Sequence, residues 1–171
     1  MKSLVWLRND LRMDDNPALR AACTESEEVH ALYIYSKNQM KLHKEASCKI
    51  EFMIANLKSL DKSLKALNIS LTIVNSDCMV NDPLIILNLI NERSISKVYW
   101  NNQFGVDEES RDRELIELLK TNNINYSSYD AQVLFPAGTF KTLEGKPYSV
   151  FTPFKKRWIE NFSLDLLDIE F

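Results

Sequence analysis

Glycine is scarce in this sequence, and its scarcity excludes the common phosphate-binding loops. Only three glycines, Gly105, Gly138 and Gly145, occur among the 171 residues. None has the spacing of the G-x-G-x-x-G loop that binds dinucleotides or of the Walker A loop that binds ATP. An α/β domain for either cofactor would carry such a loop after a strand, so the sequence argues against both.

Cysteine and histidine are also sparse. Cys23, Cys48 and Cys78 are odd in number and far apart, without the C-x-x-C spacing typical of zinc or redox sites. We therefore expect free, buried thiols and no metal site. His30 and His43 belong to no pattern with a Ser, Cys or Asp partner, so neither is predicted to be catalytic.

Long apolar runs are missing, and neither sign of charge dominates. Lys2 is followed by only five uncharged residues before Arg8, too few for a signal peptide. No window approaches the roughly 20 apolar residues that span a bilayer. The net charge of −3 indicates no chain-wide surface for nucleic acid. With 45% hydrophobic residues the composition fits one globular domain, and we expect a cytoplasmic monomer without membrane contact.

Short apolar runs alternate with helical patterns along the chain. The expected strands are Ser3–Arg8, Val29–Tyr35, Ser70–Val74, Lys97–Asn101 and Asn125–Tyr129. This alternation predicts an α/β fold with a doubly wound, mostly parallel five-stranded sheet, Rossmann-like, in the order 3-2-1-4-5. Ligands of such sheets bind beyond the carboxyl ends of the strands, at the switch between strands 1 and 4. Here that place lies between Arg8-Asn9-Asp10 and the loop from Asn101 to Glu108.

Several helices are marked by their starts or by their apolar spacing. Asn16-Pro17 and Asp82-Pro83 each predict an N-cap followed by Pro at the first helical position. Asp107-Glu108-Glu109 places acid at a third helix start, where the helix dipole favours it. An amphipathic stripe predicts a long helix through Ile50, Met53, Ile54, Leu57, Leu60, Leu64 and Leu67.

Charged residues alternate directly after the first strand. Arg8, Asp10 and Arg12 are predicted to form a salt-bridged rim that holds the connection to the next helix, although they could instead face a ligand or a neighbouring domain. Trp6 and Trp100 lie within apolar strands and are expected in the core.

Two stretches resemble the DNA photolyase and cryptochrome family. The first is Val-Trp-Leu-Arg-Asn-Asp-Leu-Arg-Met-Asp-Asp-Asn-Pro-Ala-Leu, from Val5 to Leu19. The second is Gly-Lys-Pro-Tyr-Ser-Val-Phe-Thr-Pro-Phe-Lys-Lys-Arg-Trp, from Gly145 to Trp158, expected to pack a C-terminal helix over Phe151–Phe162 onto the sheet. The chain is most similar to the N-terminal antenna domain of a folate-type cyclobutane pyrimidine dimer photolyase.

The resemblance implies that this chain is one of two domains of a longer protein and that the two domains have different functions. Residues 1–162 would form the antenna domain, and residues 163–171 would begin the linker to a helical FAD-binding domain that is absent from this chain. The antenna pigment would pass excitation to FAD, and damaged DNA would be bound only through that second domain. We therefore expect no catalytic residue here and no repair by this chain alone. A cryptochrome would share every motif, and a stand-alone domain for a small molecule or nucleotide remains the non-enzymatic alternative.

The resemblance also implies pigment contacts. Val106-Asp107-Glu108 matches a Val-Asn-Glu triplet that contacts the pterin of methenyltetrahydrofolate in the family, which implicates Glu108 and Asp107. One carboxylate can accept hydrogen bonds from both the amide N–H and the exocyclic amine of a pterin. The alternative role of these acids is to start a helix.

A deazaflavin is the alternative pigment. Family members that use it resemble each other in having a second arginine where this chain has Asn9, and an arginine is usual where it has Lys49. Both departures favour the folate. Tyr33 and Lys49 would be secondary contacts with either pigment, as would Asn9.

Overall fold

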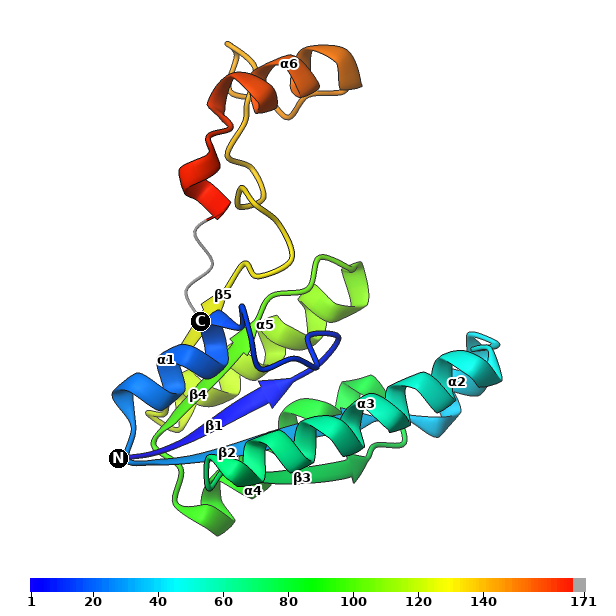
Figure 1. Ribbon diagram of the computed structural model, residues 1–171, viewed down its shortest axis with the longest axis vertical. Helices are drawn as coiled ribbons and strands as arrows, with labels where there is room; N and C mark the ends of the chain where they lie inside the picture. The colour runs from blue at the N-terminus through cyan, green and yellow to red at the C-terminus, as the bar shows by residue number, and fades with distance from the viewer. Residues whose placement is uncertain (168–171) are drawn as a thin grey trace.

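A five-stranded parallel sheet forms the centre of the computed structural model, which describes residues 1–167 (Figure 1). Its order is β3-β2-β1-β4-β5, and every neighbouring pair is parallel, as predicted. The strands are β1 (Lys2–Leu7), β2 (Glu28–Tyr35), β3 (Ser70–Asn75), β4 (Lys97–Asn101) and β5 (Asn125–Tyr129).

Helices cover both faces of the sheet. They are α1 (Pro17–Glu25), α2 (Lys37–Leu42), α3 (Ser47–Ala66), α4 (Asp82–Arg93), α5 (Val106–Thr121) and α6 (Phe151–Asn161), with short 3₁₀ turns η1 (Met79–Asn81) and η2 (Leu164–Leu167). Val5 and Leu7 pack with α1 and α3, whereas Leu4 and Trp6 pack with α4 and α5. Because β1 is covered on both sides, its sequence is apolar at successive positions. Trp6 and Trp100 are both core residues, as expected.

The predicted helix starts are confirmed at α1 and α5 but not at α4. The Asn16 side chain accepts a hydrogen bond from the Leu19 amide at 3.2 Å. Asp107, Glu108 and Glu109 occupy the first turn of α5. At α4 the N-cap is Asn81, and Asp82 already lies inside the helix. The reason is the preceding turn η1, which brings the chain into α4 with Asn81 in a helical conformation.

The apolar stripe of α3 serves two purposes. Leu57, Leu60 and Leu64 are buried, and the last two pack in the core on the sheet. Ile50 and Met53, in the first half of the helix, face a cavity instead of the sheet. The helix is therefore as predicted, but only its second half covers the core, and Ile54 and Leu67 of the predicted stripe are exposed.

The C-terminal helix was correctly predicted, but its expected packing onto the sheet is wrong. Helix α6 stands away from the sheet, and none of its residues is buried in the described structure (Figure 1). Its rings pack against the segment that precedes it: Phe135 lies 5.4 Å from Trp158, and Phe140 lies 6.1 Å from Phe154, between ring centroids. These local partners replace the sheet. Of the expected linker, residues 168–171 lie outside the described residues.

The cysteines are free but exposed, which corrects the expected burial. Cys23 lies on α1, Cys48 in the first turn of α3, and Cys78 directly before η1. Cys23 is on the side of α1 away from the buried Ala18, Leu19 and Ala22, whereas Cys48 and Cys78 lie in stretches that do not cover the core.

Candidate ligand cavity at the carboxyl edge of the sheet

Buried charges join the ends of β1 and β4. The Arg8 guanidinium donates to both oxygens of Asp112, at 2.8 and 2.7 Å, and also to the backbone carbonyl of Asn101. Asp10 accepts from the Arg8 amide at 2.7 Å and from the Asn101 side chain at 2.5 Å. We call these four residues the paired rim. It links strands that are distant in sequence. Arg8 and Asp10 therefore form a paired rim as predicted, but their side-chain partners are on β4 and α5, and Arg8 also lines the cavity described below.

Arg12 stabilises the connection from β1 to α1. Its guanidinium donates to the backbone carbonyl of Asp15 at 2.6 and 3.0 Å and to that of Ala131 at 3.3 Å. Asp15 has a positive φ of 48°, a conformation that Asp tolerates better than most residues. Arg12 therefore holds a tight turn, as the salt-bridged interpretation predicted.

Two arginines stack on one tryptophan beside the paired rim. The guanidinium carbons of Arg8 and Arg111 lie 4.8 and 4.4 Å from the ring centre of Trp6. Arg111 also donates to Asp112 at 2.9 Å and to Gln103 at 3.0 Å. Charge pairing and cation–π contact together fix the position of both guanidinium groups.

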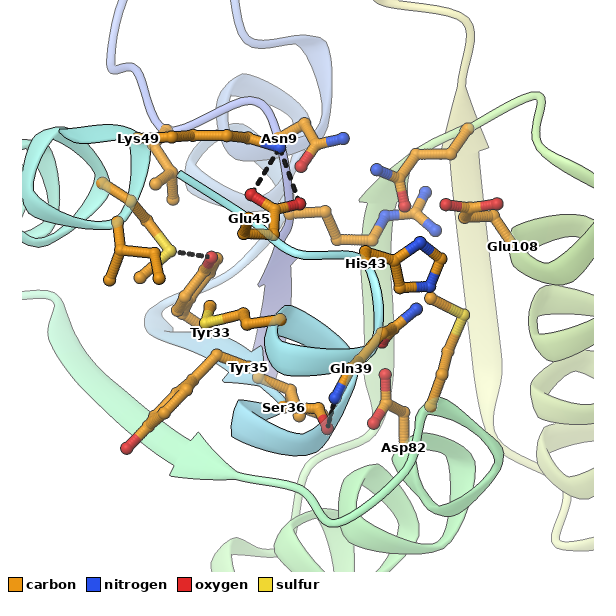
Figure 2. A pocket seen from close by; sticks show the side chains of 18 of the residues that line it. Asn9, Tyr33, Tyr35, Ser36, Gln39, His43, Glu45, Lys49, Asp82 and Glu108 are labelled. Carbon is orange, nitrogen blue, oxygen red and sulfur yellow. Dashed lines mark hydrogen bonds and ion pairs between the residues drawn. The ribbon is translucent and has the colours of Figure 1, made fainter. Parts of the chain in front are cut away.

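A cavity of about 560 Å³ opens next to these arginines (Figure 2). It lies beyond the carboxyl ends of β1 and β2, between α2, the first half of α3 and the starts of α4 and α5. Its lining residues are Trp6, Arg8, Asn9, Leu11, Tyr33, Ile34, Tyr35, Ser36, Gln39, Met40, His43, Glu45, Lys49, Ile50, Phe52, Met53, Asn56, Met79, Asp82, Gln103, Glu108 and Arg111.

The cavity extends farther over β2 than expected. The sequence predicted a site between strands 1 and 4, and the cavity does include Asn9 on one side and Glu108 on the other. However, the start of α1 occupies the space beyond β4, where the Ala18 amide donates to the Asn101 side chain at 3.2 Å. The long connection through α2 leaves the space beyond β2 open instead.

Four of the five residues implicated by resemblance line this one cavity. They are Asn9, Tyr33, Lys49 and Glu108 (Figure 2). Asp107 instead lines a neighbouring cavity of about 580 Å³. Successive helical residues point about 100° apart, so Asp107 and Glu108 face different spaces.

The side chains of this set differ in how firmly they are held. Tyr33 is buried, its hydroxyl donates to the Met53 sulfur at 3.0 Å, and burial raises its pKa to about 12. Lys49 is exposed and pairs with Glu45 at 2.7 Å (Figure 2). The Glu108 side chain forms no hydrogen bond or ion pair with any residue from 1 to 167. Its carboxylate lies against Gly105, where a Cβ would collide with it.

Sequence reasoning missed Asp82, which is 6% exposed and lines the same cavity. Its Oδ1 has no hydrogen-bond partner in the described part of the chain, and its Oδ2 lies 3.9 Å from Arg111 Nη1. Burial raises the pKa of this carboxyl group to about 6, against opposing effects of Ser76 and Arg111. The Asp-Pro pair was interpreted as a helix cap, and no further signal in the sequence points to a cavity.

The two histidines lie in different surroundings. His30 is at the opposite, amino-terminal edge of the sheet, with ring nitrogens 2.8 Å from Ser70 Oγ and 3.0 Å from Glu28. His43 lines the cavity. In the described chain, no three His, Cys, Asp or Glu residues are arranged to hold a metal ion. Nor does any helix within residues 1–167 have the length and apolar character of a membrane span.

The sequence pattern of one known family matches almost the whole chain. The DNA photolyase pattern covers residues 3–169. The chain belongs to the DNA photolyase family. It is 35% identical to the deoxyribodipyrimidine photo-lyase of Escherichia coli over 92% of its own length and 33% of that protein. It is 29% identical to cryptochrome-2 of Arabidopsis thaliana over 93% of its length and 25% of that protein.

Solved photolyase structures have the same fold. The class III photolyase of Agrobacterium tumefaciens superposes with a TM-score of 0.74 at 28% identity, over 95% of this chain and 32% of that one. An archaeal photolyase from Sulfolobus tokodaii, described as holding two FAD molecules and implying a novel light-harvesting cofactor, gives 0.71 at 22% identity, over 83% of this chain and 32% of that one. The chain thus spans about a third of the length of the photolyases it matches, and aligns with their N-terminal region.

Proposed function

We propose that this chain is the antenna domain of a photolyase and that the carboxyl-edge cavity binds its light-harvesting pigment. The observation that carries the proposal is the convergence of Asn9, Tyr33, Lys49 and Glu108 on one cavity of about 560 Å³. Cavities of roughly 300–1,000 Å³ with apolar walls and a few polar groups are typical of sites for small organic ligands.

The lining suits a planar heterocycle. Tyr33, Met53 and Ile50 provide apolar and aromatic surface for the faces of a ring. Glu108, which is free of protein partners within residues 1–167, can accept two N–H donors from the ring edge. These features support methenyltetrahydrofolate as the pigment, with Glu108 as its principal contact. Asp107 would act only through the neighbouring cavity.

A deazaflavin is the second candidate pigment. Its ring would occupy the same apolar walls, with Asn9 and Lys49 as polar contacts. The Sulfolobus tokodaii photolyase is described as holding two FAD molecules and implying a novel light-harvesting cofactor, which supports a flavin-like pigment as this second candidate.

With a pigment bound, the domain would absorb near-ultraviolet or blue light and transfer the excitation. The recipient would be FAD in a C-terminal helical domain, the partner through which damaged DNA is bound. Residues 1–162 would form the antenna domain, with the linker beginning at residue 163. A cryptochrome would use the same domain for signalling, and the similarity to cryptochrome-2 keeps that as the alternative.

Pigment titration tests the proposal. We expect methenyltetrahydrofolate to bind the 171-residue chain with a Kd weaker than about 1 μM, because the family's pterin also contacts the second domain. Replacing the charged acceptor in Glu108→Gln should weaken binding about tenfold. Glu109→Gln, an exposed neighbour outside the cavity, is the matched control and should bind like the wild type.

Two results would refute the proposal. One is the absence of binding of either pigment at millimolar concentration. The other is an equal loss of affinity in Glu108→Gln and Glu109→Gln, which would place the pigment outside the cavity.

A further inference from the structure

Asp82 is a buried carboxylate of this cavity whose hydrogen bonds are incomplete in the described structure. It lies at the start of α4 but caps no helix, since α4 has no side-chain cap hydrogen bond. Its side chain is 8% exposed, and Oδ1 has no partner among the described residues. The Ser76 hydroxyl lies close enough to Asp82 to lower its pKa, but its single hydrogen is donated to the carbonyl of Cys78 at 2.6 Å. A buried acceptor without a partner destabilises a fold unless something else provides a donor.

Arg111, on the neighbouring helix α5, provides the complementary donor. Its Nε and Nη2 donate to Asp112 and Gln103, whereas Nη1 has no hydrogen bond in the described chain. Asp82 Oδ2 lies 3.9 Å from Nη1, too far for a hydrogen bond. The stack on Trp6 and the pair with Asp112 fix the Arg111 guanidinium at this distance from Asp82.

A donor and an acceptor are thus held side by side at the cavity wall. The matching ligand group has an acceptor and a donor on adjacent atoms, and a cyclic amide, with neighbouring C=O and N–H, is such a group. A simple amine offers only donors and a carboxylate only acceptors, so each would leave one of the two protein groups unmatched.

We propose that Asp82 and Arg111 together bind the cyclic-amide edge of a planar heterocycle, Asp82 accepting from the ring N–H and Arg111 donating to the ring carbonyl. This inference rests on the proposed function of the cavity and deepens it. Pterins, deazaflavins and flavins all contain this edge, so the pair selects the chemical class rather than one pigment. Glu108, which is less buried than Asp82, remains available for a second donor, such as the exocyclic amine of a pterin.

Lumiflavin and 3-methyllumiflavin test the inference because they differ only at the ring N–H. We expect the wild-type chain to bind lumiflavin about tenfold more tightly, by fluorescence titration, since methylation removes the donor and leaves Asp82 unmatched. In Asp82→Asn the preference should fall to about twofold or less, because the charged acceptor is gone. Asp77→Asn, an exposed carboxylate that does not line this cavity, is the control and should keep the wild-type preference.

The outcomes separate this inference from the proposed function. Equal affinity of the wild-type chain for lumiflavin and 3-methyllumiflavin would overturn the role of Asp82. This test requires no variant. An unchanged preference in a folded Asp82→Asn would overturn that role as well. Binding of methenyltetrahydrofolate without binding of lumiflavin would show that Asp82 and Arg111 do not select the cyclic-amide class as a whole. It would leave the proposed function standing. Binding of no heterocycle at all would overturn the proposed function, and this inference with it.

Discussion

The carboxyl edge of the sheet has two regions that are both rich in charge but differ in how their charges are matched. In the paired rim, Asp10 and Asp112 each accept hydrogen bonds from buried neighbours. At the cavity, Asp82 has an oxygen without a partner in the described structure, and Glu108 forms no hydrogen bond or ion pair with residues 1–167. Arg111 contacts both regions. It donates a hydrogen bond to Asp112, and its Nη1 lies 3.9 Å from Asp82 Oδ2.

This difference separates structural charges from charges available to a ligand. A buried carboxylate whose hydrogen bonds are complete contributes to a single native arrangement. One that is buried and incomplete lowers stability, and such residues concentrate at functional sites. We therefore expect substitutions in the two regions to change stability in opposite directions.

The largest effect is expected in the paired rim. Asp112→Asn would leave Arg8 and Arg111 buried beside each other without their shared counter-charge. We expect the free energy of unfolding to fall by about 3–5 kcal/mol in urea denaturation. Asp61→Asn, which removes an exposed i,i+4 pair with Lys65, should change it by less than about 0.5 kcal/mol. A loss below about 1 kcal/mol in Asp112→Asn would show that the rim is not structural.

At Asp82 the charged carboxylate is expected to lower the free energy of unfolding, in contrast to Asp112. Its pKa is raised from 3.8 to about 6 in the folded chain, so the folded state holds its proton more tightly than the unfolded state. Stability therefore falls as pH rises from about 4 to about 6, and the penalty is complete above that, at up to about 3 kcal/mol. The other charged groups that act on this carboxyl group are Arg111, which lowers its pKa, and Asp112, which raises it, both on α5.

Asp82→Asn removes this penalty. We expect the variant to be more stable than the wild type at pH 7.5, with the difference shrinking toward pH 4, as measured by urea denaturation at each pH. A variant that is less stable at pH 7.5 would mean that Asp82 has a structural partner, and it would place this residue with the paired rim.

The smallest effect on stability is expected at Glu108. Because its side chain has no partner among residues 1–167, Glu108→Gln should change the free energy of unfolding by less than about 0.5 kcal/mol. The same variant is expected to lose pigment affinity, so stability and binding separate at this position. A destabilisation above about 1 kcal/mol would assign Glu108 to holding the start of α5.

The sheet could be predicted from the sequence because its strands are short apolar runs between helical patterns. Two strands, Lys97–Asn101 and Asn125–Tyr129, have the predicted bounds. The role of Asn16 was also clear, since an Asn-Pro pair at a helix start is a local signal. Such features depend on neighbours in sequence, which is why they could be found without a structure.

Features that depend on tertiary packing could not be predicted. The turn η1 shifts the start of α4 and directs Asp82 inward, whereas Asp82-Pro83 alone looks like an ordinary cap. The rings of α6 pack with residues 135–148, a segment without periodicity. The cavity residues come from seven elements and the loops between them, so resemblance to a family indicated Glu108 but nothing indicated Asp82.

The central claim is that a pigment binds in the carboxyl-edge cavity, and amide chemical-shift mapping of the ¹⁵N-labelled chain tests it most directly, even at weak affinity. On addition of methenyltetrahydrofolate we expect the largest shifts at the amides of Asn9, Tyr33, Asp82 and Glu108, with none in α6. The absence of shifts at millimolar pigment, or shifts confined to residues 135–162, would contradict the claim.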